Sequence, residues 1–104
     1  MMLADRKLGT LPLDAEGATA LAIDALGFLA GDPVLMNRFL QLSGLEAHEL
    51  RDAAADPAFF AGLLDFILAD ERTLTAFATE AGVAPASVGR AREALSGHYG
   101  GVER

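Results

Sequence analysis

The chain has 104 residues and no cysteine, and its 8 lysines and arginines face 15 aspartates and glutamates, a formal net charge of −7. One domain is expected at this length, and neither a disulfide nor a thiolate metal site can form. Alanine occurs 21 times and leucine 17 times, against 4 valines and 2 isoleucines. This composition predicts an all-α protein, because alanine and leucine lose little side-chain freedom in a helix.

Helices are predicted at 14–30, 32–42, 46–55, 57–69, 71–81 and 85–96. Two of these starts depend on the pairs Asp32-Pro33 and Asp56-Pro57, because an aspartate caps a helix N-terminus and a proline suits its first position. The predicted domain organisation is a flexible N-terminal arm at 1–13, a single helical domain at 14–96 and a flexible C-terminal tail at 97–104. Short connections favour a compact orthogonal bundle of five to six short helices.

The segment 57–69 is apolar on nearly all sides and is predicted to be the central helix. Its small side, which would let another helix approach closely, consists of Ala58, Ala61, Gly62, Asp65 and Ala69. For Asp65 a solvated position is favoured over a catalytic one. The apolar stretch is shorter than the roughly 18 residues of a membrane span, and residues 1–7 carry charges where an export signal is apolar. A cytoplasmic protein without a membrane partner is expected.

Residues 32–54 align with residues 70–92 without a gap, at an offset of 38 positions. The four identities pair Asp32 with Asp70, Phe39 with Phe77, Gly44 with Gly82 and Ala53 with Ala91. The matched glycines fall between predicted helices, where a left-handed residue would form the turn. Each unit is therefore predicted to be a helix-turn-helix-like hairpin, through either duplication or shared turn chemistry.

The second unit, residues 70–92, resembles the helix-turn-helix of bacterial repressors, whose second helix enters the DNA major groove. In this chain that helix is 85–96, and its candidate nucleic-acid contacts are Ser87, Arg90 and Arg92. Charge opposes this role, because residues 14–96 hold 13 acids and 5 arginines, a net charge of 5 − 13 = −8. DNA affinity depends largely on neutralising phosphates, so DNA binding is an alternative hypothesis.

Few other residues suggest chemistry. His48, Glu49 and Asp52 lie close in sequence, but a solvated polar face is favoured over a metal site. No catalytic residue and no cofactor is predicted, because the common nucleophile and phosphate-loop patterns are missing. A cluster of apolar side chains is interpreted as core, with a ligand pocket or docking groove as the alternative: Phe28, Phe59, Phe60, Leu63, Leu64 and Phe66.

Three motifs follow one another in the sequence: Leu21-Ala-Ile-Asp-Ala-Leu-Gly-Phe-Leu-Ala-Gly-Asp-Pro33, Arg38-Phe-Leu-Gln-Leu-Ser-Gly-Leu45 and Leu64-Asp-Phe-Ile-Leu-Ala-Asp-Glu71. Together they resemble a small family of short, mainly helical bacterial proteins, mostly from alphaproteobacteria, that is classed as a domain of unknown function. The resemblance covers about residues 18–95. It implies an all-α fold and a bacterial, cytoplasmic origin, and it implies no catalytic residues.

The function expected from the sequence is a small, non-enzymatic, cytoplasmic protein-interaction module with an unknown protein partner. Its acidic composition and the missing catalytic residue sets favour this hypothesis. The first alternative is a helix-turn-helix DNA-binding protein that uses the helix at 85–96. The second is a sensor of apolar ligands, and association into a homo-oligomer is left open.

Overall fold

The computed structural model describes residues 15–100, with side chains described from 16 to 95. Its elements are α2 (Ala15–Ala30), α3 (Pro33–Ser43), the 3-10 turn η1 (Ala47–Glu49), α4 (Leu50–Ala53), α5 (Pro57–Leu68), α6 (Glu71–Ala81) and α7 (Pro85–Gly100). The part of the chain described here contains no strand. The predicted all-α fold is confirmed.

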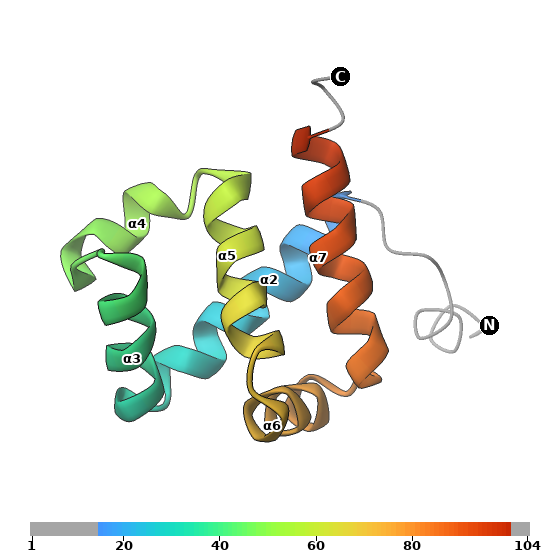
Figure 1. The fold of residues 1–104 in the computed structure, drawn as a ribbon, viewed down its shortest axis with the longest axis horizontal. Coiled ribbons are helices and arrows are strands. Elements are labelled where there is room, and N and C mark those ends of the chain that lie inside the picture. The colour runs from blue at the N-terminus through green and yellow to red at the C-terminus, as the bar shows by residue number, and fades with distance from the viewer. Residues whose placement is uncertain (1–14, 101–104) are drawn as a thin grey trace.

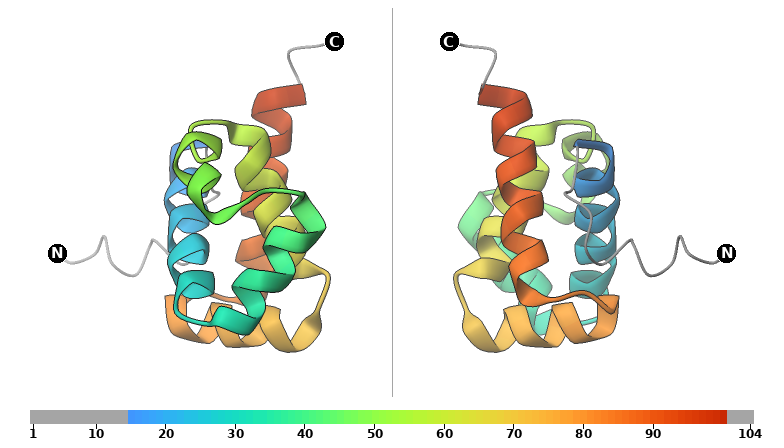
Figure 2. Two further views of the ribbon diagram at one scale, coloured as in Figure 1. Left: turned by 90° about the vertical axis from the view of Figure 1, so that its left-hand side faces the viewer. Right: turned by 90° about the vertical axis from the view of Figure 1, so that its right-hand side faces the viewer.

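The helices cross one another at steep angles. α5 and α7 pack side by side, and α2 passes behind both of them (Figure 1). α6 lies across one end of this pair, and the turned views show it nearly perpendicular to α7 (Figure 2). Between α2 and α3 the chain turns by 116°. The arrangement is the orthogonal bundle that the short connections predict.

The core lies where α2, α5, α6 and α7 meet. α2 contributes a face of small residues, Ala18, Ala22 and Ala25, which are fully buried and let the other helices approach closely. Burial of each large apolar side chain contributes roughly 1.5–3 kcal/mol. Those with almost no exposed surface are Leu29, Leu63, Leu64, Ile67, Phe77, Val88 and Leu95. α5 contacts α2, α3, α6 and α7, and α2 likewise contacts α3, α5, α6 and α7, so α5 shares the predicted central position with α2.

Aspartate caps and left-handed glycines set the limits of several helices. The carboxylates of Asp32, Asp56 and Asp70 accept hydrogen bonds of 2.9–3.2 Å from backbone N–H groups in the first turns of α3, α5 and α6. Gly44 (φ 79°) and Gly82 (φ 73°) end α3 and α6 in the left-handed region. The two aligned units therefore share a cap, a helix and a glycine turn, as predicted.

The helix predicted at 46–55 is wrong in its extent. This segment forms only the turn η1 and one turn of helix, α4, and none of their residues is buried. Pro57 holds Asp56 in an extended conformation (φ −107°, ψ 124°), so the helix must end before it. The segment also has little apolar surface to bury, so a longer helix would gain no packing.

At the other end of the chain, α7 continues to Gly100, four residues beyond the predicted end at 96. Gly97 lowers helix stability by about 1 kcal/mol but does not require a left-handed turn. The predicted tail at 97–104 is therefore helical up to residue 100. The arm at 1–13 and residues 101–104 lie outside the described residues.

Within residues 15–100, no single helix is both long enough and apolar enough to cross a membrane. Within this range, only α2 and α3 taken together have the length and apolar composition of a membrane span, and the two helices are bent by 116° relative to each other. The apolar segment 57–69 forms α5, a helix of 12 residues with four buried side chains.

Candidate functional site

Two open hollows are lined in part by α3. We call one of them the apolar groove: it lies between α3, the connection that carries α4, and α5, and has a volume of about 640 Å³. Its lining consists of Phe39, Leu42, Ser43, Leu45, Ala53, Asp56, Ala58, Phe59, Gly62, Asp65, Phe66 and Ala69. We call the other the polar hollow; it lies between the end of α2, the start of α3 and α6.

The floor of the apolar groove is aromatic. The Phe39 ring meets the Phe66 ring at a centroid distance of 5.5 Å and the Phe59 ring at 5.8 Å, both edge to face. Such pairs are worth about 0.5–1.5 kcal/mol beyond the burial of their area. Phe39 is buried, whereas Phe59 and Phe66 are only half-buried. The rings therefore hold one another in place and still present apolar surface to the groove.

The α5 wall of the groove is made of small residues. Ala58, Gly62 and Ala69 are exposed and repeat at helical spacing, so they correspond to the small side predicted for this helix. Ala61, predicted with them, is half-buried against the core instead. A Cβ atom built on Gly62 meets no atom within 4 Å. This wall is therefore uncovered, and its small residues would let a further helix approach it closely.

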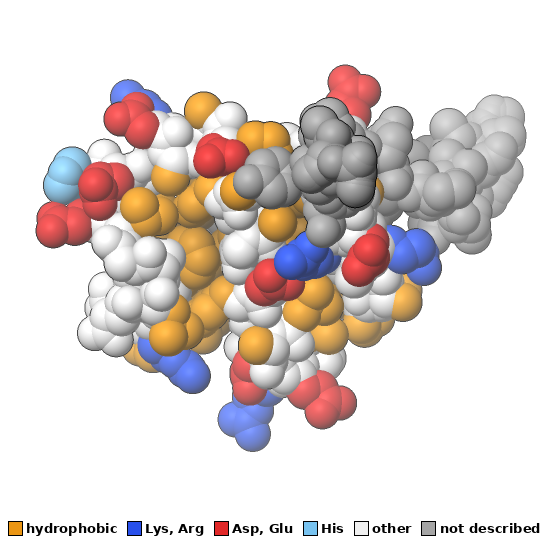
Figure 3. All heavy atoms as spheres, turned by 45° about the horizontal axis from the view of Figure 1, so that its top comes forward, with side chains coloured by type: hydrophobic (Ala, Val, Ile, Leu, Met, Phe, Trp, Pro, Cys, Tyr) orange, Lys and Arg blue, Asp and Glu red, His pale blue; other side chains and the backbone are white. Residues whose placement is uncertain are grey.

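Leu42 stands on the α3 side of the groove with 76% of its surface exposed. Such exposure is the largest among the described large hydrophobic residues, the others being Val34 at 68% and Ile23 at 54%. Figure 3 shows apolar side chains gathered in a strip along this face, with acidic side chains around its upper end. Leu42 therefore adds exposed apolar surface beside the half-open aromatic floor of the groove.

The charged groups that line the groove are Asp56 and Asp65. Asp56 caps α5. Asp65 accepts two hydrogen bonds from Arg92 on α7, with Nε–Oδ1 at 2.7 Å and Nη2–Oδ2 at 3.0 Å. These hydrogen bonds raise the pKa of the Arg92 guanidinium above its ordinary value. The solvated carboxylate expected at Asp65 is therefore half of an ion pair that joins α5 to α7.

The three candidate nucleic-acid contacts lie on α7, but the structure does not bring them together on one face. The α6–α7 hairpin has the helix-turn-helix shape, with the Val83 N–H bonded to the Ala78 carbonyl at 3.0 Å across the Gly82 turn. Ser87 is buried, and its hydroxyl accepts a hydrogen bond of 3.1 Å from Arg90. Arg92 is half-buried and pairs with Asp65. Of the three candidates, Arg90 alone is exposed.

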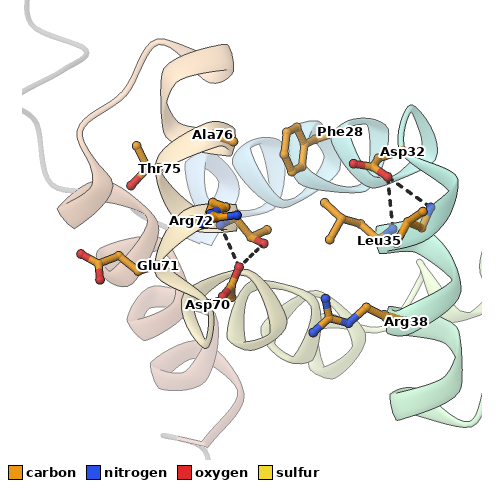
Figure 4. Close-up of a pocket in the computed structure, with 11 residues that line it drawn as sticks. Phe28, Asp32, Leu35, Arg38, Asp70, Glu71, Arg72, Thr75 and Ala76 are labelled. Carbon is orange, nitrogen blue, oxygen red and sulfur yellow. Dashed lines mark hydrogen bonds between the residues drawn. The ribbon is translucent and has the colours of Figure 1, made fainter.

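The polar hollow, of about 1180 Å³, brings Arg38 and Arg72 near the caps of α3 and α6 (Figure 4). Its acids, Asp32, Asp70 and Glu71, outnumber these two arginines, so the hollow has no cationic excess that would favour an anion. The carboxylates of Asp32 and Asp70 are already bonded within their own helices. Helix capping therefore accounts for two of the three acids in the hollow.

Asp70 has the most perturbed carboxylate in this region. The Thr73 hydroxyl donates to it at 2.6 Å and the Thr73 N–H at 3.0 Å. These hydrogen bonds, together with the charges of Arg38 and Arg72, lower the pKa of Asp70 below its ordinary value of 3.8. The effect stabilises the ionised cap of α6.

The residues considered for a metal site lie at the surface. His48 Nδ1 is 3.7 Å from Glu46 Oε1, and both side chains are about three-quarters exposed. Among the side chains that the structure describes, residues 16–95, no group of three or more from histidine, aspartate and glutamate is placed to hold a metal ion.

A family model described as "Protein of unknown function (DUF3572)" matches residues 15–98. This match confirms the resemblance to a family of unknown function, and its limits nearly coincide with the helical domain. No curated protein and no solved structure matches the chain.

Proposed function

The chain belongs to the DUF3572 family, whose function is unknown, and we propose that it is a non-enzymatic module that binds an apolar segment of a partner protein. The observation that supports this proposal is the apolar groove, where half-buried rings lie open beside the exposed Leu42. Contiguous apolar surface of this kind marks interaction sites in otherwise well-packed proteins. The proposal includes the cytoplasmic setting that the family resemblance implies.

A sensor of apolar ligands is the second candidate, because the groove volume of about 640 Å³ lies in the range of about 300–1,000 Å³ that is usual for ligand pockets. Such pockets bury most of the ligand surface. The groove, by contrast, has an exposed wall on α5 and an exposed rim at Leu42. A long partner segment covers an open groove better than a small molecule does.

DNA binding through α7 has less support. Of its candidate contacts, Ser87 is buried and Arg92 is paired with Asp65. The described residues 15–100 carry 5 arginines and 12 acids, a net charge of 5 − 12 = −7, which repels a phosphate backbone.

The proposal is tested with two matched glycine variants of the full chain. Gly62→Met fills the groove, whereas Gly27→Met makes the same change at an exposed position of α2, outside the groove. Neither added Cβ meets an atom within 4 Å, and methionine is the better helix former, so both variants should fold. Each chain is used to capture proteins from a lysate of its own organism.

A partner that binds the wild type and Gly27→Met but not Gly62→Met supports the proposal. The purified partner should then show the same loss of affinity for Gly62→Met. Equal capture by all three chains, or capture by none, counts against a binding role for the groove.

A further inference from the structure

The apolar groove is bounded by helices on both walls, α3 on one side and α5 on the other. Helices satisfy their own backbone hydrogen bonds, and no sheet edge exists in residues 15–100 that could pair with an extended peptide. A partner must therefore be held by side-chain packing. A helix brings its own backbone already paired, and the small wall at Ala58, Gly62 and Ala69 lets it approach closely.

The charges around the groove select the kind of helix. Asp56 and Asp65 line it, but Arg92 on α7 pairs with Asp65 and compensates its charge, so the negative charge of the lining comes from Asp56. The connection between Gly44 and Pro57 adds Glu46, Glu49 and Asp52, against the single Arg51. With Asp56 included, this connection has a formal charge of 1 − 4 = −3. The upper end of the groove is therefore electronegative, and this would steer a basic segment toward it.

We propose that the occupant of the apolar groove is a basic amphipathic α-helix of a partner protein. This inference rests on the function proposed above and names the chemistry of the partner. Apolar residues of the helix at positions i, i+3 or i+4, and i+7 would pack on the floor of Phe39, Phe59 and Phe66. Its lysines and arginines would lie toward the acidic connection.

A second copy of this chain is a poorer occupant. Two copies would bring two acidic rims together, and the described part of each carries a charge of −7. Like charges set against each other at an interface are unfavourable.

The test uses two fluorescent synthetic helical peptides of equal length with the same leucine and alanine positions. All remaining positions are lysine in one peptide and glutamate in the other. Binding to the full chain is followed by fluorescence anisotropy. We expect the lysine peptide to bind at least about tenfold more tightly at low salt, and this preference to shrink as salt screens the charges.

Three variants locate the effect. Gly62→Met should remove binding of the lysine peptide, and Gly27→Met should leave it unchanged. The double variant Asp52→Asn/Asp56→Asn should weaken it several-fold and reduce its salt dependence. Asparagine at 56 still caps α5, so this variant keeps the groove while it loses charge.

Several results would overturn the inference. Equal binding of both peptides, with loss in Gly62→Met, would leave a binding groove without a preference for basic partners. Unchanged binding of the lysine peptide to Gly62→Met would mean that it attaches elsewhere on the acidic surface. A wild-type dimer in analytical ultracentrifugation that Gly62→Met dissociates would make a second copy the occupant. Failure of both peptides to bind would also reject a basic helix, whereas the proposed function is judged by partner capture.

Discussion

Arg92 on α7 holds the Asp65 carboxylate on α5 by two parallel hydrogen bonds, at 2.7 Å and 3.0 Å, across 27 positions of the sequence. The pair lies at the edge of the apolar groove, where Asp65 is half exposed and Arg92 is about a quarter exposed. It engages the only charged residue of α5 and one of the candidate DNA contacts of α7 at the same time. This one tertiary contact therefore bears on two hypotheses: it gives Asp65 a structural partner in place of a catalytic role, and it occupies Arg92, a candidate DNA contact.

The first prediction concerns the strength of this ion pair. A double-mutant cycle of Asp65→Ala and Arg92→Ala, followed by urea unfolding, should give a coupling energy of about 0.5 kcal/mol, because the pair is partly exposed to water. The coupling should decrease at high salt. Strictly additive effects of the two substitutions would show that the pair does not stabilise the contact between α5 and α7.

The second prediction concerns the turn of the α6–α7 hairpin. Gly82→Val should lower the free energy of unfolding by about 1–2 kcal/mol, because a side chain in the left-handed region meets its own backbone. The cost lies in the backbone, since a Cβ atom on Gly82 meets no other atom within 4 Å. Gly82→Asn should cost less, because asparagine adopts this conformation more readily.

Replacing a glycine inside a helix should have the opposite effect on the free energy of unfolding. Gly62→Ala, in the middle of α5, should raise the free energy of unfolding by roughly 0.5–1 kcal/mol. Thermal unfolding of the variants at positions 62 and 82 compares them directly. An unchanged melting temperature for Gly82→Val would contradict a left-handed turn at this residue.

The parts of the fold that depend on a few neighbouring residues could be predicted from the sequence. Asp32 and Asp70 mark helix starts, and Gly44 and Gly82 mark turns, because capping and left-handed turns involve only adjacent residues. The short α4 could not be predicted in this way. Its extent depends on how much apolar surface its neighbours leave to cover, and this is a property of the packed bundle.

The candidate site shows the same limit more clearly. The sequence predicts the phenylalanine cluster as core, with a pocket or docking groove as the alternative; Phe60 is buried as core, whereas Phe59 and Phe66 are half-buried and line the groove. Which side of α5 stays open depends on where α3 and α7 pack. Likewise, nothing near Arg92 in the sequence identifies Asp65 as its partner.

The third prediction separates binding from stability with two leucines. Leu63 is fully buried, so Leu63→Ala should cost about 2–5 kcal/mol through lost burial and a cavity. Leu42 is 76% exposed, so Leu42→Ser should change the free energy of unfolding by less than about 0.5 kcal/mol. Leu42→Ser should nevertheless weaken binding of the lysine peptide. Urea unfolding measures the stability of both variants, and fluorescence anisotropy measures binding of the lysine peptide. A folded Leu42→Ser variant with full affinity would show that Leu42 is not part of the binding surface.

The fourth prediction concerns stability in acid. The Thr73 hydrogen bonds lower the pKa of Asp70 in the folded chain below its ordinary value of 3.8. The ionised carboxylate therefore contributes its full stabilisation above the unfolded value, and this contribution is lost as the pH falls through the folded value. Asp70→Asn keeps a cap acceptor but does not titrate. Below about pH 4, its melting temperature should fall less steeply than that of the wild type; parallel curves would contradict the shift.

The fifth prediction addresses the DNA alternative through Arg90, which is exposed and hydrogen-bonds Ser87. With a charge of −7 on the described residues, we expect no binding to duplex DNA even at low salt, since affinity requires phosphate neutralisation. Fluorescence anisotropy of a labelled duplex measures this, with Arg51→Ala on α4 as the control for loss of one positive charge. Salt-dependent binding that Arg90→Ala weakens and Arg51→Ala does not would establish α7 as a recognition helix, and the acidic surface would then have to face away from the DNA.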